Sequence, residues 1–332
     1  MRAVAQQAGV SVTTVANVLN RPEIVAPPTR MRVEEAMKRV GFVRNGLARQ
    51  LRGVPSRLVG VVVLDIANPF YAEVNRGIED RLAEDQCMML LCSIGPQADK
   101  ETQTLTWLQE QGVRGIVISP VRDDPARLEE ISGQGTPVVL LDYLPDEADL
   151  CAVGVDHYGG GRLTGDHLLE LGHRRIAFLG GPTTVKAVKE RRQGLRDALQ
   201  DAGLDLAHSL VDIDMRPANL VDAADAAIDR LMLMKDPVTA IVCMNDMAAL
   251  GVLQGLDRHG VRVPDEMSVV GYDDIAFASH LTPALTTVRQ PTYELGCVAA
   301  ELLLEEAEPG HRHRTVCFPP QLIVRASTAD AR

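Results

Sequence analysis

Hydrophobic and polar positions follow two different patterns along the chain, and the patterns meet near residue 57. In the N-terminal part, apolar residues recur at helical spacing on both sides of a glycine: Val4, Ala5, Ala8, Val15, Val18 and Leu19. Gly9 can adopt a positive φ that reverses the chain, and Ser11 can cap the free N–H groups of a second helix. This pattern predicts a helix-turn-helix.

The second of these helices would present a face of short side chains, which a DNA major groove can admit. The side chains on that face are Val12, Thr13, Ala16 and Asn17. A third helix is expected over residues 28–40, with an apolar set turned toward the small core: Val33, Ala36, Met37 and Val40. An ordinary three-helix packing unit without nucleic acid would show the same periodicity, so the pattern alone leaves both interpretations open.

Residues 45–53 form a helix-capable stretch of barely two turns between Gly41 and Pro55. A helix this short is not stable alone, so it is expected to fold only when docked on a partner.

From Leu58 onward, short apolar runs alternate with amphipathic helices, which predicts parallel sheets covered on both faces. The runs are 58–64, 88–92, 115–118, 137–141, 175–179, 240–243 and 268–270. The pattern glycine-apolar-x-Asp-x-Leu occurs at 77–82 and again at 194–199, each time after a strand. This internal repeat suggests two doubly wound lobes.

Polar and aromatic residues follow many of these apolar runs, where open α/β sheets bind their ligands. They are Asn68, Phe70, Tyr71, Asp142, Arg191, Asn245, Asp246, Asp273 and Gln290. Planar polar groups bridge adjacent hydroxyls and aromatic rings cover a C–H face, so the set suits a polyhydroxylated ligand. Each residue also has a plainer reading, such as a turn at Asn68-Pro69, a helix cap at Asp273-Asp274 or a solvated helix face at Arg191.

Charge divides the chain at the same place as the hydrophobic pattern. Residues 1–57 carry ten lysines and arginines against three glutamates, a net charge of +7, which leaves −18 for the rest because the whole chain is −11. A basic N-terminal part on an acidic body suits contact of that part with phosphate, although chance surface composition is an alternative.

Other function classes find little support in the sequence. Apolar stretches are far shorter than a membrane span and no signal peptide is evident, so a cytoplasmic protein is expected. The six cysteines lack C-x-x-C spacing and His311 and His313 lie in a polar loop, so buried thiols and solvated histidines are expected, with no metal or cofactor. Neither a phosphate-binding glycine motif nor a nucleophile with its base is present, so no catalytic residue is expected.

Taken together, these motifs resemble the lactose-repressor/galactose-repressor (LacI/GalR) family of bacterial transcription regulators over the whole chain. The resemblance is carried by VAQQAGVS at 4–11, TVANVLN at 14–20, the segment 45–53, NPFYAE at 68–73, LGHRRIAF at 171–178, NDMAALG at 245–251, VPDEMSVVGYDD at 263–274 and PALTTV at 283–288.

The resemblance implies a small all-α helix-turn-helix domain at 1–43, a hinge helix and linker at 44–57, and an α/β periplasmic-binding-protein-like body of two doubly wound lobes at 58–332. The first lobe would take about 58–156 and 288–316, and the second about 157–287 and 317–328. It further implies a homodimer that represses transcription at a pseudo-palindromic, double-stranded operator DNA under control of a small sugar-like effector.

Site residues carry over from the family by position. The DNA-binding residues would be Ser11, Val12, Thr13, Thr14, Asn17, Asn20, Asn45, Arg49 and Leu51, with Leu51 as a minor-groove wedge. The effector-binding residues would be Asn68, Phe70, Tyr71, Asp142, Arg191, Asn245, Asp273 and Gln290.

Departures from the family pattern concern mainly the DNA-reading helix. The usual Ser and Arg are replaced by Ala16 and Asn17, which removes a phosphate contact and favours adenine over guanine, so a non-standard operator is expected. The family's capping Thr before the first helix is missing, because the sequence opens with Met1-Arg2. A sugar receptor with the same two lobes and a sugar-modifying α/β enzyme remain the alternatives.

Overall fold

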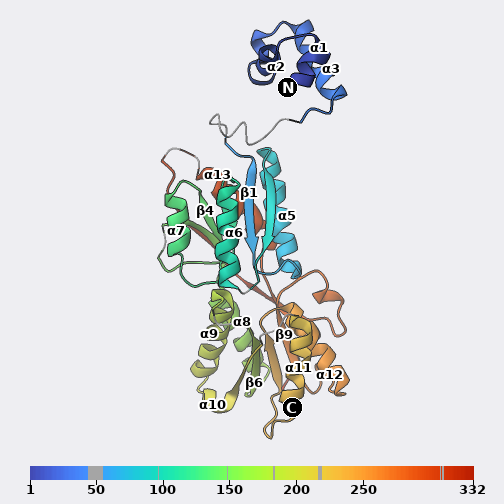
Figure 1. Cartoon of the computed structure of the whole chain (residues 1–332). Coiled ribbons are helices and arrows are strands. Elements are labelled where there is room, and N and C mark those ends of the chain that lie inside the picture. The colour runs from blue at the N-terminus through green and yellow to red at the C-terminus, as the bar shows by residue number, and fades with distance from the viewer. Residues whose placement is uncertain are drawn as a thin grey trace. The chain divides into compact units, whose positions relative to one another are not determined.

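The computed structural model describes residues 1–43, 55–95, 97–147, 149–181, 184–215, 219–306, 308 and 310–332. The chain divides into two compact units, residues 1–56 and 57–332, which we call the head and the body (Figure 1). The expected hinge helix at 45–53, with the DNA-contact candidates Asn45, Arg49 and Leu51, lies outside the described residues.

The head is a helix-turn-helix followed by a third helix. Its elements are α1 (Arg2–Ala8), α2 (Val12–Asn20), the short 3-10 helix η1 (Pro22–Ile24) and α3 (Pro27–Arg39). Gly9 ends α1 with φ 63°, and the Ser11 hydroxyl accepts a hydrogen bond from the Thr14 N–H at 3.0 Å at the start of α2. Both local expectations are therefore confirmed.

The core of the head is small and aliphatic. It consists of Val4, Ala5, Ala8, Val15, Val18, Val33 and Ala36, with Leu19 and Met37 partly buried beside them. Val40 does not join this core, contrary to expectation, because α3 ends at Arg39 and leaves the Val40 side chain 40% exposed at the C-cap.

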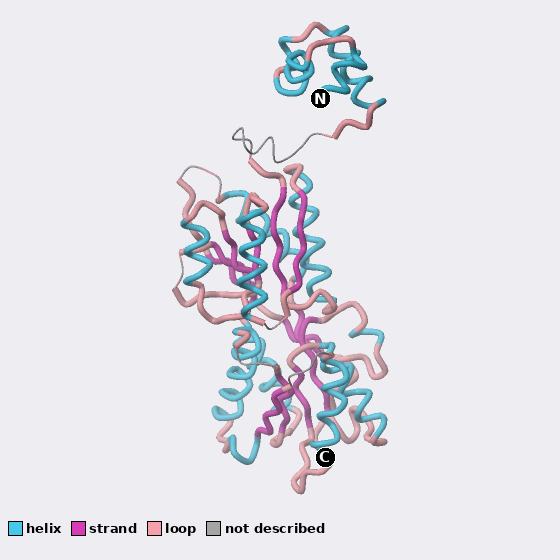
Figure 2. The backbone as a smooth tube through the Cα atoms, in the orientation of Figure 1, coloured by secondary structure: helices cyan, strands magenta, loops and turns pink. Residues whose placement is uncertain are grey.

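The first lobe of the body is a six-stranded parallel sheet between two helical layers (Figures 1 and 2). Its strands are β1 (Leu58–Val63), β2 (Met88–Ser93), β3 (Ile116–Ile118), β4 (Val138–Leu141), β5 (Cys151–Val155) and β11 (Thr315–Phe318), and its helices are α5 (Pro69–Glu84), α6 (Ala98–Glu110), α7 (Ala126–Gly133) and α13 (Thr292–Glu305). Helices α5 and α13 cover one face of the sheet, and α6 and α7 cover the other.

The second lobe repeats this construction. Its strands are β6 (Ile176–Gly180), β7 (Leu210–Asp214), β8 (Ala240–Cys243), β9 (Ser268–Asp273), β10 (Thr286–Arg289) and β12 (Gln321–Ile323), and its helices are α8 (His157–Glu170), α9 (Lys186–Asp201), α10 (Leu206–Ser209), α11 (Leu220–Met232), α12 (Asp246–Arg258) and the 3-10 helix η2 (Ala278–His280). Helices α8 and α9 pack on one face, and α11 and α12 on the other.

The internal repeat seen in the sequence corresponds to a repeat of topology. The strand orders are β11-β5-β4-β3-β1-β2 and β12-β10-β9-β8-β6-β7, which match position by position, although β12 runs antiparallel to β10. A Cβ on Gly77 would lie 2.2 Å from the Tyr293 carbonyl oxygen, and one on Gly194 would lie 2.1 Å from that of Tyr158. The repeated glycine therefore lets a second helix approach closely in both lobes.

The chain passes between the lobes three times, after β5, after β10 and after β11. Because β10 belongs to the second sheet and β11 to the first, the later two crossings fall after Arg289 and after Phe318. The boundaries expected at 287/288 and 316/317 fall inside these two strands, so they shift by two residues. No helix among the described residues is long and apolar enough to cross a membrane.

Candidate functional site

The outer face of α2 carries the DNA-contact candidates that the structure describes. Val12, Thr13 and Asn20 are exposed, and Asn17 is partly exposed between them. Ser11 and Thr14 differ from the others, because their hydroxyl groups lie 2.9 Å apart and the Ser11 oxygen also caps the helix. These two side chains therefore fix the start of α2, on which the exposed residues are mounted.

A second candidate site lies between the lobes of the body, where six polar side chains meet. We call it the inter-lobe cluster: Asn68, Asp142, His157, Arg191, Asp273 and Gln290. Asn68 and Asp142 follow β1 and β4 of the first lobe, whereas Arg191 on α9 and Asp273 at the end of β9 belong to the second lobe. His157 and Gln290 stand at two of the crossings.

Asp273 is the centre of this cluster and is 4% exposed. Its carboxylate accepts hydrogen bonds from the Gln290 amide at 2.7 Å and from the Asn68 amide at 3.5 Å. The guanidinium of Arg191 lies 3.8 Å away. The Asp273 carboxylate thus contacts side chains from both lobes and from one of the segments that connect them. The Gln290 Oε1 atom is buried with no hydrogen-bond partner among the described residues.

Arg191 is also held in place by uncharged groups beside the Asp273 carboxylate. Its NH1 atom donates to the Met244 carbonyl at 2.7 Å, its Nε atom lies 3.3 Å from Nδ1 of His157, and its guanidinium lies 3.6 Å from the centre of the Tyr272 ring. Stacking on Tyr272 and burial fix the plane of the guanidinium. The reading of Arg191 as a solvated helix face is therefore wrong.

His157 connects the second lobe to the first and was not found by the sequence analysis. Because an arginine can only donate, Nδ1 of His157 accepts from Arg191 and Nε2 carries the proton that it donates to Asp142 at 2.8 Å. His157 is the first residue of α8 and follows β5 closely, but the apolar run of β5 was not among those identified in the sequence. Tyr272 was missed because it lies inside β9.

Aromatic side chains lie beside the cluster on the first lobe. Phe70 and Tyr71 are buried at the start of α5, with ring centroids 5.0 Å apart in an edge-to-face arrangement. The Tyr71 hydroxyl lies 3.2 Å from that of Ser119, the residue after β3. Burial, followed by the Asp142 charge, raises the pKa of Tyr71 far above its usual value, so this hydroxyl stays neutral.

Asn245 has a structural role in the loop after β8. Its carboxamide oxygen accepts the Ala248 N–H at 2.9 Å and so caps α12. It lies next to Met244, whose carbonyl binds Arg191. Asn245 therefore positions the loop that carries the Met244 carbonyl, and its expected contact with an effector stays a prediction.

Electrostatics and backbone geometry both set Asp273 apart. Burial raises its pKa to about 7, because the nearby Arg191 charge and the amide hydrogen bonds offset the loss of water only in part. Its φ is 110°, which a non-glycine residue adopts only at a cost. A half-ionised carboxylate held in a strained conformation is typical of a ligand-binding position.

Ion pairs at the edge of the cluster also join the lobes. Lys189 of α9 donates to Asp123 of the first lobe at 2.9 Å, and Lys186 lies 3.3 Å from Asp146. Burial opposes ionisation of Asp123, but hydrogen bonds from Lys189 and Tyr143 outweigh it and lower the pKa of that carboxyl. The lobes therefore contact each other through charged groups that a change in lobe orientation would separate.

Comparisons with known proteins agree with this architecture. Residues 1–45 match the model of bacterial regulatory proteins of the lacI family, and residues 165–328 match that of a periplasmic binding protein-like domain. The HTH-type transcriptional repressor PurR of Photobacterium profundum is 32% identical over 330 residues, covering 98% of both chains.

Solved structures give the same result. The lac repressor dimer bound to operator and the anti-inducer ONPF has a TM-score of 0.84 and 27% identity, covering 98% of both chains. A ribose-bound LacI family transcriptional regulator from Enterococcus faecium has a TM-score of 0.75 and 30% identity, covering 83% of this chain and 100% of its own.

The fold is thus that of a two-lobed binding protein with a helix-turn-helix head. The chain belongs to the LacI family of bacterial regulatory proteins, whose members are DNA-binding transcription regulators and not enzymes.

Proposed function

We propose that this protein is a cytoplasmic repressor that binds a pseudo-palindromic operator as a homodimer and is controlled by a small sugar-like effector bound at the inter-lobe cluster. The observation that carries the effector part is the convergence on Asp273 of groups from both lobes, beside a buried Gln290 oxygen that lacks a partner.

The exposed face of α2 contacts the DNA bases in this proposal. Val12 offers an apolar surface to a thymine methyl group, and Asn17 offers an amide that pairs with adenine in the major groove. The basic charge of residues 1–57 supplies the attraction to phosphate, which the acidic body does not. The segment 45–53, with Leu51 as the wedge, stays part of this proposal.

The effector class follows from the chemistry of the cluster. Asp273, Asn68 and Gln290 offer acceptors and amides side by side, and Arg191 adds charged donors, which together suit adjacent hydroxyl groups. Phe70 and Tyr71 add apolar rings for a C–H face. The ribose bound by the Enterococcus faecium relative supports a sugar or sugar derivative as the effector.

Regulation would act through the relative orientation of the lobes. A ligand that contacts Asn68 and Asp142 on one lobe and Arg191 and Asp273 on the other favours one orientation, and its binding is therefore linked to operator affinity. Because the ion pairs of Lys186 and Lys189 join the two lobes, a change in lobe orientation would break or re-form them.

Calorimetry with a panel of pentoses, hexoses, sugar acids and purines tests the effector proposal. We expect one sugar class to bind to the wild type, and Asp273→Ala to weaken its binding about ten- to a hundredfold, since a charged hydrogen bond is worth about 1.5–3 kcal/mol. Asp265→Ala, an exposed carboxylate of the same lobe, is the matched control and should bind normally.

Two outcomes would refute this assignment. A ligand that binds wild type and Asp273→Ala equally well would place the pocket elsewhere. A purine that binds while every sugar fails would keep the site but replace its ligand class.

A further inference from the structure

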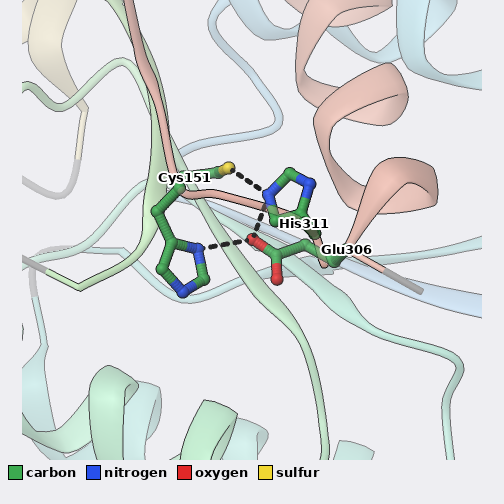
Figure 3. Close-up of side chains that lie close together, drawn as sticks. Cys151, Glu306 and His311 are labelled. Atoms are coloured by element: carbon green, nitrogen blue, oxygen red, sulfur yellow. Dashed lines mark hydrogen bonds and ion pairs between the residues drawn. The ribbon is translucent and has the colours of Figure 1, made fainter. Parts of the chain in front are cut away.

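A second cluster of polar side chains, which are potential metal ligands, lies where the neighbouring strands β5 and β11 of the first lobe begin. Cys151 is the first residue of β5, whereas Glu306, His311 and His313 belong to the segment that leads from α13 to β11. Figure 3 shows Cys151, Glu306 and His311 directed toward one another. The histidines were expected to be solvated, but the His311 side chain is only 11% exposed and its Nε2 atom lies 3.1 Å from the Cys151 sulfur.

The separations among these groups are small enough for one tetrahedral metal ion to bind between them. His311 Nε2 lies 3.4 Å and His313 Nδ1 lies 3.0 Å from the same oxygen of Glu306. One ligand atom from each of the four residues lies within 4.8 Å of all the others. Ligand atoms around a tetrahedral zinc ion are about 3.4–3.6 Å apart, given bonds of about 2.0–2.3 Å.

Neighbouring groups support the same reading. The Arg314 backbone N–H donates to the Cys151 sulfur at 3.4 Å, which favours a thiolate but does not outweigh burial, which raises the pKa of this thiol to about 12. His313 turns Nδ1 toward the cluster, while its Nε2 atom lies 3.7 Å from the Asp149 carboxylate. The Asp149 carboxylate is exposed and too distant for a hydrogen bond, so it adds only negative charge on the outer side of the His313 ring.

We propose that Cys151, Glu306, His311 and His313 form a structural binding site for Zn²⁺ or a similar divalent cation. One sulfur, two imidazole nitrogens and one carboxylate oxygen are ligands that zinc accepts, whereas Mg²⁺ and Ca²⁺ prefer oxygen alone. Binding forms four coordinate bonds, and the thiol proton of Cys151 leaves to solvent.

The bound cation would join the start of β5 to the segment before β11. These strands are neighbours, with Thr315 paired to Ala152, so the cation would close the outer end of this pair. A cation here therefore stabilises the pairing of β5 with β11 at one edge of the first sheet.

The test uses the full-length protein, reduced and stripped of metal with a chelator, and Co²⁺ as a spectroscopic probe. We expect one Co²⁺ per chain, with sulfur-to-cobalt charge transfer in the near ultraviolet and intense visible bands of a tetrahedral site. Zn²⁺ should displace the cobalt and raise the thermal midpoint, because it binds the native state only.

Substitutions of the four residues test which of their side chains bind the metal ion. Cys151→Ser should abolish the charge-transfer band, and His311→Asn should weaken Co²⁺ binding by about tenfold or more. Cys317→Ser and His280→Asn, an exposed cysteine and an exposed histidine outside the cluster, are the matched controls and should bind as wild type does.

Because substitution of the buried Cys151 can impair folding, a variant of the partly exposed His313 is tested as well. His313→Asn should weaken Co²⁺ binding to a similar degree while the circular dichroism spectrum stays unchanged. Absence of the charge-transfer band at millimolar Co²⁺, or its persistence in Cys151→Ser, would show that these four residues merely hydrogen-bond to one another and would overturn the proposal.

Discussion

The head and the body are built from similar aliphatic side chains but on very different scales. Seven buried residues form the core of the head, whereas each lobe of the body has a separate core on both faces of its sheet. The head also carries the positive charge that the body lacks. The comparison agrees with the proposed division of roles, in which the small, basic unit contacts DNA and the large, acidic one binds the effector and mediates regulation.

Removal of the head gives the sharpest test of this division. A fragment of residues 58–332 should lose operator binding completely and keep effector affinity, because the inter-lobe cluster lies entirely within the body. A gel-shift assay and calorimetry on the same preparation would measure both. Operator binding by the fragment would show that the body contributes to DNA contact.

The salt dependence of operator binding measures how much the charge of the head contributes to affinity. With +7 on residues 1–57 of each of two chains, about ten phosphate contacts are expected, so affinity should fall roughly 10³-fold or more between about 50 and 200 mM salt. Effector affinity should change little over the same range. A shallow slope in fluorescence anisotropy would contradict the role given to these charges.

Arg191 tests whether effector binding can be changed without changing the head. Arg191→Ala removes the side chain that contacts His157, Met244 and Asp273, and should lower effector affinity about ten- to a hundredfold. Operator affinity in the absence of effector should persist, as measured by anisotropy. Arg262→Ala, an exposed arginine of the same lobe, is the control and should leave both affinities unchanged.

The pH dependence of effector binding gives the smallest expected effect. Asp273 has its pKa raised to about 7 by burial, so the carboxylate that accepts ligand hydroxyls is mostly neutral at pH 6 and mostly ionised at pH 8. Affinity should therefore rise about tenfold from pH 6 to pH 8. Asp273→Asn should flatten the profile, and an unchanged slope in that variant would assign the titration to another group.

The raised pKa of Asp273 also makes the stability of the folded protein depend on pH. The usual pKa of an aspartate is 3.8 and the folded value is about 7, so the native state binds the extra proton between these two limits. The contribution of Asp273 to stability thus falls as the pH rises through this window and is fully present only below it.

Much of the fold could be predicted from the sequence because fully apolar runs mark buried parallel strands. All seven runs became strands within a residue or two, except that β9 continues to Asp273. Strand β7 was missed because its sequence, LVDID, places two aspartates in an edge strand, and β11 and β12 were missed because each is only a few residues long and partly exposed.

The structure brings together several predicted site residues that lie at or after the end of a strand. Asp142 directly follows β4, Asp273 is the last residue of β9 and Asn68 comes five residues after β1, and the cluster forms around them. His157 follows a strand too, but the apolar run of β5 had not been identified, so its position could not be inferred. The group around Cys151 could not be predicted from the sequence, because Cys151 and His311 are 160 positions apart and their contact depends on the pairing of β5 with β11.

The triple passage of the chain between the lobes also sets the order in which the protein can fold during synthesis. The first sheet contains β11, the second contains β12, and Ser327 bonds to the backbone of Thr286 and Val269 inside the second lobe. Neither lobe can therefore be complete until residues 315–327 have left the ribosome. The head has no such dependence, because all three of its helices come from the first 39 residues and can form early in translation.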